Sequence, residues 1–145
     1  MFGLTRRLRV GVTVEQVAAL VRAKLRGAQP AQNTLLVDVR STGEVSATGV
    51  IPTAVNLPLK LLEAALSDEV GEEEFAETFG VPKPQPGTTQ IIFYCAHGVR
   101  SSIAVEVVEG LGFSGAGNVT GGFAAWQKYY GELQKNGDSP LTPNP

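Results

Sequence analysis

The sequence predicts an α/β fold, with a central, mostly parallel sheet of about five strands and helices on both faces. Short apolar runs alternate along the chain with longer segments whose apolar residues recur at helical spacing. The clearest of these runs are continuously apolar, which is typical of strands in a parallel sheet that is covered on both faces. This alternation of strand and helix patterns therefore favours a parallel sheet over an antiparallel one.

The composition is that of an ordinary globular domain. The chain has 145 residues, of which 43% are hydrophobic and 18% charged, with a net charge of -2 and a pI of about 5.4. This length suits one domain with its own core, and the small negative charge argues against a nucleic-acid partner. No apolar run approaches the roughly 18 residues of a membrane span. We therefore expect a monomer with neither a membrane nor a nucleic-acid partner.

The cysteine content and the N-terminal charges bear on localisation. One cysteine cannot form an internal disulfide, which favours a reducing compartment, and we expect the cytoplasm. Arg6, Arg7 and Arg9 precede the first acidic residue, Glu15, so a mitochondrial presequence is an alternative to a frayed basic end. The expected organisation is a basic N-terminal segment with the first strand (1–12), the domain (13–134) and a disordered C-terminal tail (135–145).

The first half of the chain predicts one long helix and two short strands. Thr13 has the character of an N-cap, and apolar residues recur at helical spacing over residues 14–26. The stretch GAQPAQN ends this helix. The apolar run at 35–37 ends at Asp38 and predicts a buried strand. The segment STGEVSATG then predicts a loop, and AVNL predicts the second short strand.

The second half continues the alternation of strands and helices. Residues 59–80 predict two short helices, and residues 91–94 are the clearest buried strand. The remaining expected elements are a helix that ends at Gly112, a strand near 117–119 and a helix from Phe123 to about Leu133. Ligands of parallel sheets bind beyond the carboxyl ends of the strands. Asp38 and Cys95 both fall at such ends.

The stretch YCAHGVRSS joins the strand at 91–94 to the following helix, and it holds the chain's only cysteine and only histidine. A thiolate is the reactive form of cysteine, and the free N–H groups at a helix N-terminus lower its pKa. Gly98 removes one side chain from the arc, so the loop can curl into an anion-binding nest around Cys95. The expected cradle consists of the backbone N–H groups of Ala96, His97, Gly98, Val99 and Ser101.

Arg100 closes this arc and can either bind an anionic substrate or pair with Asp38. We expect the pairing with Asp38, because a strand-end acid that faces a loop arginine braces the turn. His97 can steady an anion, act as a base or simply face solvent. Cys95 can also be a buried small hydrophobe, although its position before Gly98 and Arg100 disfavours this interpretation. One cysteine and one histidine cannot form a zinc site, so we expect no metal and no cofactor.

Two segments, LLVDVRSTGEVSATGVIPTAVNLPL and FYCAHGVRSSIAVEVVEGLGFSGAGNVTGGFAAW, resemble the single-domain rhodaneses, a family of sulfurtransferases. The resemblance runs from residue 13 to 130, and the acidic stretch 61–80 is similar to the thiosulfate:glutathione sulfurtransferase type. The residues that match the family signatures are Asp38, Val39, Arg40, Gly49, Ile51, Pro52, Ala54, Asn56, Pro58, Cys95, Gly98, Arg100, Ser101, Gly121, Gly122 and Trp126.

This resemblance implies a rhodanese-like fold and a two-step transfer of sulfane sulfur. The Cys95 thiolate would take sulfur from thiosulfate or a persulfide donor and become a persulfide. A second nucleophile, which is cyanide in an assay or glutathione or thioredoxin in the cell, would then remove it. Where rhodaneses often carry a histidine and a glycine, this chain has Val50 and Thr53, and we expect a local change there rather than a loss of activity.

Two other functions remain open from the sequence. Cysteine-dependent phosphatases and arsenate reductases use a similar anion cradle, but the dual-specificity type has five residues between cysteine and arginine. Here only Ala96, His97, Gly98 and Val99 separate Cys95 from Arg100, so the loop suits a sulfur atom better than a tetrahedral phosphate. The other alternative is a non-catalytic rhodanese-like interaction module, which the presence of both Cys95 and Arg100 disfavours.

Overall fold

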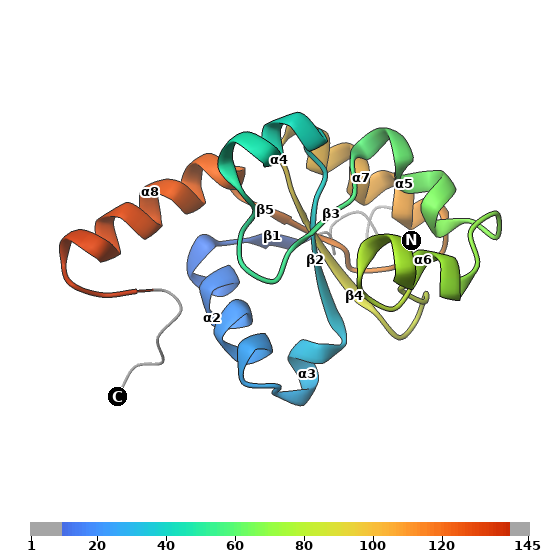
Figure 1. Cartoon of the computed structure of the whole chain (residues 1–145), viewed down its shortest axis with the longest axis horizontal. Coiled ribbons are helices and arrows are strands. Elements are labelled where there is room, and N and C mark those ends of the chain that lie inside the picture. Colours follow the sequence, from blue (N-terminus) through green and yellow to red (C-terminus); the bar gives the residue numbers. More distant parts are fainter. Residues whose placement is uncertain (1–9, 140–145) are drawn as a thin grey trace.

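The computed structural model describes residues 10–139, and these form an α/β fold around one all-parallel sheet (Figure 1). The strand order is β1-β5-β4-β2-β3, which confirms the predicted fold class. The N-terminal arginines and the last six residues of the expected tail lie outside the described residues. The strands are β1 (Val10–Val12), β2 (Thr34–Asp38), β3 (Val55–Asn56), β4 (Gln90–Tyr94) and β5 (Gly117–Val119).

Helices cover both faces of the sheet. Figure 1 shows α2 and α8 on one side, and α5, α6 and α7 on the other. No helix within residues 10–139 is both long and apolar enough to cross a membrane. The helices are α2 (Val14–Leu25), α3 (Gln29–Gln32), α4 (Thr42–Thr48), α5 (Leu59–Leu66), α6 (Glu72–Phe79), α7 (Val99–Gly110) and α8 (Gly122–Lys135).

Alternation along the central strands divides the interior into two cores. Ile91 and Phe93 of β4 pack with α5, α6 and α7, whereas Tyr94 packs with α2 and α8. Because successive side chains of a strand point to opposite faces, Cys95 continues the Ile91–Phe93 side and is buried there. The sheet thereby sets the direction of the cysteine before the loop begins.

Helix α4 corrects the sequence prediction, which placed a loop at STGEVSATG. Ser41 and Glu44 form a reciprocal capping box, in which each side chain accepts a hydrogen bond from the other residue's backbone N–H. Gly49 then ends the helix with a φ of 76°. The S-x-x-E pattern is a known helix start, but the polar, glycine-containing composition of the segment favoured a loop. This short helix carries Glu44 to the functional site.

Residues 51–54 form a tight turn in which Thr53 holds an unfavourable conformation. The Ala54 N–H donates to the Ile51 carbonyl at 2.9 Å, and Thr53 has a φ of 74°. A turn with proline second and a positive φ third normally carries glycine at the third position. The Thr53 hydroxyl is also buried and has no hydrogen-bond partner in the described structure.

We therefore expect Thr53→Gly to stabilise the protein by about 1 kcal/mol, because it removes the positive-φ strain and the unsatisfied hydroxyl. Urea denaturation measures the effect. Thr53→Val separates the two causes, since it removes the hydroxyl but keeps a β-branched side chain at positive φ. A Thr53→Gly protein less stable than the wild type would contradict the argument.

Candidate active site

The carboxyl ends of β2 and β4 lie side by side, where these two neighbouring strands leave the sheet. The two strands pair in register, with Asp38 opposite Tyr94, so Asp38 and Cys95 come to the same edge as predicted. Asp38 and its neighbour Val37, however, point to opposite faces of the sheet. Cys95 lies in the same core as Val37, so the Asp38 side chain is on the other face. The two residues share an edge but belong to different clusters of side chains.

Asp38 pairs with Arg40 in a buried cluster. Arg40 donates from Nη2 to Asp38 Oδ2 at 2.7 Å and from Nε to both carboxylate oxygens at 3.1 Å. Its Nη1 also donates to Thr48 Oγ1, and its Nη2 to the Gly49 carbonyl, both at 2.9 Å. The guanidinium lies 4.1 Å from the centre of the Phe123 ring. Arg40 therefore ties α4 and α8 to the end of β2.

Arg100 pairs with Glu44, not with Asp38, which corrects the sequence prediction. Its Nη1 and Nη2 donate to the two carboxylate oxygens of Glu44 at 2.6 and 2.9 Å. The prediction was wrong because Arg40 already occupies Asp38 and because the unpredicted helix α4 brings a second acid to the loop. The Arg100 hydrogen bond is the main reason that the pKa of Glu44 falls to about 2.

The Cys95 sulfur lies inside the loop, where hydrogen-bond donors face it. The Gly98 N–H donates to Sγ at 3.0 Å and the Ser101 N–H at 3.4 Å, while the Ser101 hydroxyl oxygen lies 3.3 Å away. Gly98 has a φ of 111° and precedes the first residue of α7. Cys95 is 1% exposed. The predicted cradle thus includes Gly98 and Ser101 as direct donors to the sulfur.

The pKa of the Cys95 thiol is set by two opposing effects. Burial raises it. Hydrogen bonds that the thiolate accepts from the Ser101 hydroxyl and from the backbone N–H groups of Ser101, Gly98 and His97 lower it by more, so the net pKa lies below its usual value. The side chain of Val99 points to solvent, being 73% exposed. The hydrogen bonds to the sulfur therefore favour the thiolate form of Cys95.

The start of α8 holds the other side of the loop. The N–H groups of Phe123 and Ala124 donate to the carbonyls of Cys95 and Ala96 at 2.8 and 3.1 Å. At Gly122, a Cβ atom would lie 2.5 Å from the Cys95 carbonyl oxygen, and the φ is 61°. Only glycine fits this position, which gives a physical reason for the Gly-Gly pair of the family signature.

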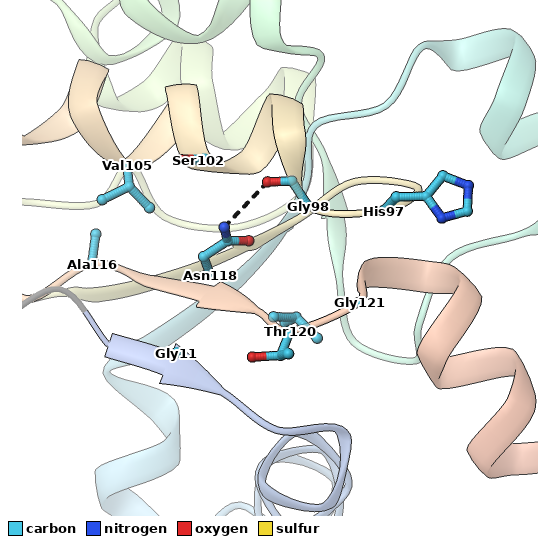
Figure 2. A pocket seen from close by; sticks show the side chains of 10 residues that line it. Gly11, His97, Gly98, Ser102, Val105, Ala116, Asn118, Thr120 and Gly121 are labelled. Carbon is cyan, nitrogen blue, oxygen red and sulfur yellow. Dashed lines mark hydrogen bonds between the residues drawn. The ribbon is translucent and has the colours of Figure 1, made fainter.

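His97 lines two cavities beside the loop. One has a volume of about 400 Å³ and lies between the loop and β5 (Figure 2). The other, of about 350 Å³, is bordered by Arg40, Glu44 and Phe123. The His97 side chain is exposed, and Figure 2 shows its ring directed away from Asn118. His97 is thus placed at the rim of the site rather than against the sulfur.

Sequence reasoning missed Glu44 and Asn118 as members of this site. Asn118 of β5 hydrogen-bonds both Ser101 Oγ and the Gly98 carbonyl. The capping-box spacing from Ser41 was a usable signal for Glu44. Nothing in the local sequence marked Asn118, because its partners lie 17 and 20 residues away. Within residues 10–139, no three Cys, His, Asp or Glu side chains gather in a group that could hold a metal ion.

The fold and the loop define a class of α/β proteins in which a cysteine at a strand end is held by the N-terminus of the next helix. Residues 20–129 match the family model described as the rhodanese-like domain, and the chain belongs to that family.

Named relatives are similar over most of the chain. The human thiosulfate:glutathione sulfurtransferase is 34% identical over 103 residues, 71% of this chain and 87% of that protein. The mitochondrial thiosulfate sulfurtransferase RDL2 of Saccharomyces cerevisiae is 35% identical over 114 residues, 79% of this chain and 70% of that protein. A Schizosaccharomyces pombe relative is 36% identical over 95 residues, and the chain covers 64% of its length.

Solved structures agree with these similarities. The crystal structure of the single-domain sulfurtransferase RDL2 of Saccharomyces cerevisiae has a TM-score of 0.68 at 33% identity, covering 86% of this chain and 93% of that one. A human single-domain sulfurtransferase has a TM-score of 0.63 at 30% identity, covering 81% and 95%.

Proposed function

We propose that this protein is a sulfurtransferase that carries sulfane sulfur on Cys95. The observation that carries the proposal is the buried sulfur atom with backbone N–H donors from Gly98 and Ser101. Such donors stabilise a thiolate, and they can equally hold the terminal sulfur of a persulfide anion. The names of the human and yeast relatives support this reaction class.

The proposed reaction has two balanced half-reactions. In the first, the Cys95 thiolate attacks the outer sulfur of thiosulfate, the S–S bond of the donor breaks, and sulfite leaves with the bonding electron pair. In the second, an acceptor thiolate attacks the outer sulfur of the Cys95 persulfide and leaves with it as a new persulfide. Cys95 returns to its thiolate form, so no external oxidant or reductant is needed.

The proposed donor is thiosulfate or a persulfide, and the proposed acceptor is glutathione or a protein thiol such as thioredoxin. The name of the human relative includes thiosulfate and glutathione, which supports this pair. We propose that the protein acts as a monomer, in the cytoplasm or, like the yeast relative by its name, in mitochondria.

Intact mass spectrometry after incubation with thiosulfate tests the function. We expect the protein to gain the mass of one sulfur atom and to lose it when glutathione or cyanide is added. A wild-type protein that stays unmodified would favour the non-catalytic interaction module. A parallel assay with an aryl phosphate ester tests the phosphatase alternative, and rapid hydrolysis of the ester would overturn the assignment.

We expect Arg100→Ala to slow sulfur loading by about tenfold, because the loop loses its charge-assisted pair with Glu44 and the positive charge beside the sulfur. His97→Ala is the matched control, since it removes an exposed side chain of the same loop, and we expect little change. Stopped-flow measurement of sulfite release compares the two variants. A larger effect from His97→Ala would reverse the roles assigned to these residues.

A further inference from the structure

Asn118 lies in β5, and its carboxamide faces the loop that holds the Cys95 sulfur. Its Nδ2 donates to the Gly98 carbonyl at 3.2 Å, as the dashed line in Figure 2 shows, and its Oδ1 lies 2.6 Å from Ser101 Oγ. One side chain therefore contacts Gly98 and Ser101, two of the residues whose backbone N–H groups donate to the sulfur. We propose that Asn118 is a positioning residue, which holds Gly98 and Ser101 so that their donors point at Cys95.

The direction of each hydrogen bond follows from the chemistry of the groups. The Gly98 carbonyl can only accept, so the amide nitrogen of Asn118 must face it. The remaining amide oxygen can also only accept, so the single hydroxyl hydrogen of Ser101 points at Asn118. A lone pair of the Ser101 oxygen then faces the sulfur at 3.3 Å and accepts the hydrogen of the Cys95 thiol.

Loss of the thiol proton changes this arrangement. An oxygen lone pair that faces a thiolate is unfavourable, so the Ser101 hydroxyl turns its hydrogen toward the sulfur. The Asn118 oxygen then gives up its hydrogen bond. Asn118 thus competes with the sulfur anion for one hydrogen of Ser101 while it keeps the Gly98 N–H aligned with the sulfur.

The charges around the sulfur come from several elements. Arg100 and Glu44 form an ion pair at the loop, Asp38 and Arg40 pair at the end of β2, and His97 lies in the loop itself. These groups are the same in all variants below. The inference rests on the proposed function, but its test needs only the reactivity of the thiolate and not sulfur transfer.

The test compares the rate of Cys95 alkylation by iodoacetamide across pH. In Asn118→Asp, the carboxylate has no hydrogen for the Gly98 carbonyl, holds the Ser101 hydrogen more strongly and places a negative charge near the sulfur. We expect alkylation at neutral pH to slow about tenfold, with recovery of the wild-type rate in alkaline buffer. A purely structural defect would lower the rate at every pH.

Thr120→Asp is the matched control. Thr120 lines the same cavity, two residues along the chain, and Figure 2 shows its side chain apart from the loop. The Thr120→Asp substitution introduces the same charge without contact with Gly98 or Ser101. We therefore expect a much smaller shift in the pH profile of Cys95 alkylation. An unchanged profile in Asn118→Asp, or equal shifts in the two variants, would overturn the inference.

A double-mutant cycle tests the inference with neutral substitutions, and it decides the matter if Asn118→Asp does not fold. We expect the effects of Asn118→Ala and Ser101→Ala on the alkylation profile to be non-additive, because the two residues share one hydrogen. Additive effects in folded variants would count against Asn118 acting through Ser101. A wild-type protein that is alkylated normally but never gains sulfur would refute the proposed function alone.

Discussion

Replacement of Cys95 by serine is expected to abolish sulfur loading. A hydroxyl does not ionise at neutral pH, so the donors of Gly98 and Ser101 would face a neutral, weakly nucleophilic oxygen. We expect sulfite release to fall by at least about 10³-fold, as for other catalytic nucleophiles, and the intact mass to stay unchanged after incubation with thiosulfate.

Ser102→Ala provides the control for this variant. Ser102 is an exposed residue of α7 near the loop, and we expect wild-type loading after its replacement. The pH dependence gives a second check in the wild type. Because the pKa of Cys95 lies below its usual value, loading should persist as the pH falls below the usual thiol range and decline only when the thiolate becomes protonated. Sulfur gain by Cys95→Ser would show that another group is the carrier.

The largest loss of stability is expected from Arg40→Met. Arg40 is 3% exposed and Asp38 is fully buried, so the substitution leaves a buried carboxylate without its cation. Breaking a buried pair in this way costs about 3–5 kcal/mol. The contacts of Arg40 with Thr48 and Gly49 are lost as well, which detaches α4 from the sheet. Urea denaturation measures the free energy of unfolding.

Two further variants separate the causes. The double variant Asp38→Leu/Arg40→Met removes both charges, and we expect it to recover part of the lost stability. Arg100→Ala breaks an ion pair whose side chains are 37% and 38% exposed, so its cost should be below about 1 kcal/mol. If Arg40→Met cost no more than Arg100→Ala, the buried pair would not be the structural tie described above.

Much of the fold was predictable because it depends on local patterns. Continuous apolar runs marked β2 and β4, and helical spacing from Thr13 marked α2, whose bounds the structure sets at Val14–Leu25. Helix α4 was the exception. Its seven residues bury no side chain fully, so no apolar periodicity marked it, and its capping box was the only signal. The missed helix led directly to the wrong partner for Arg100.

The sequence by itself determined that a lone cysteine follows a buried strand and precedes a helix with Gly98 and Arg100 between them. Those features are local, since they depend only on residues that are close together in the sequence. Only the tertiary structure decided which side chains complete the site. Glu44 is 56 residues from Arg100, and Asn118 reaches the loop from a neighbouring strand. Such partners depend on strand order and on the side of each strand that a residue occupies, and a one-dimensional pattern contains neither.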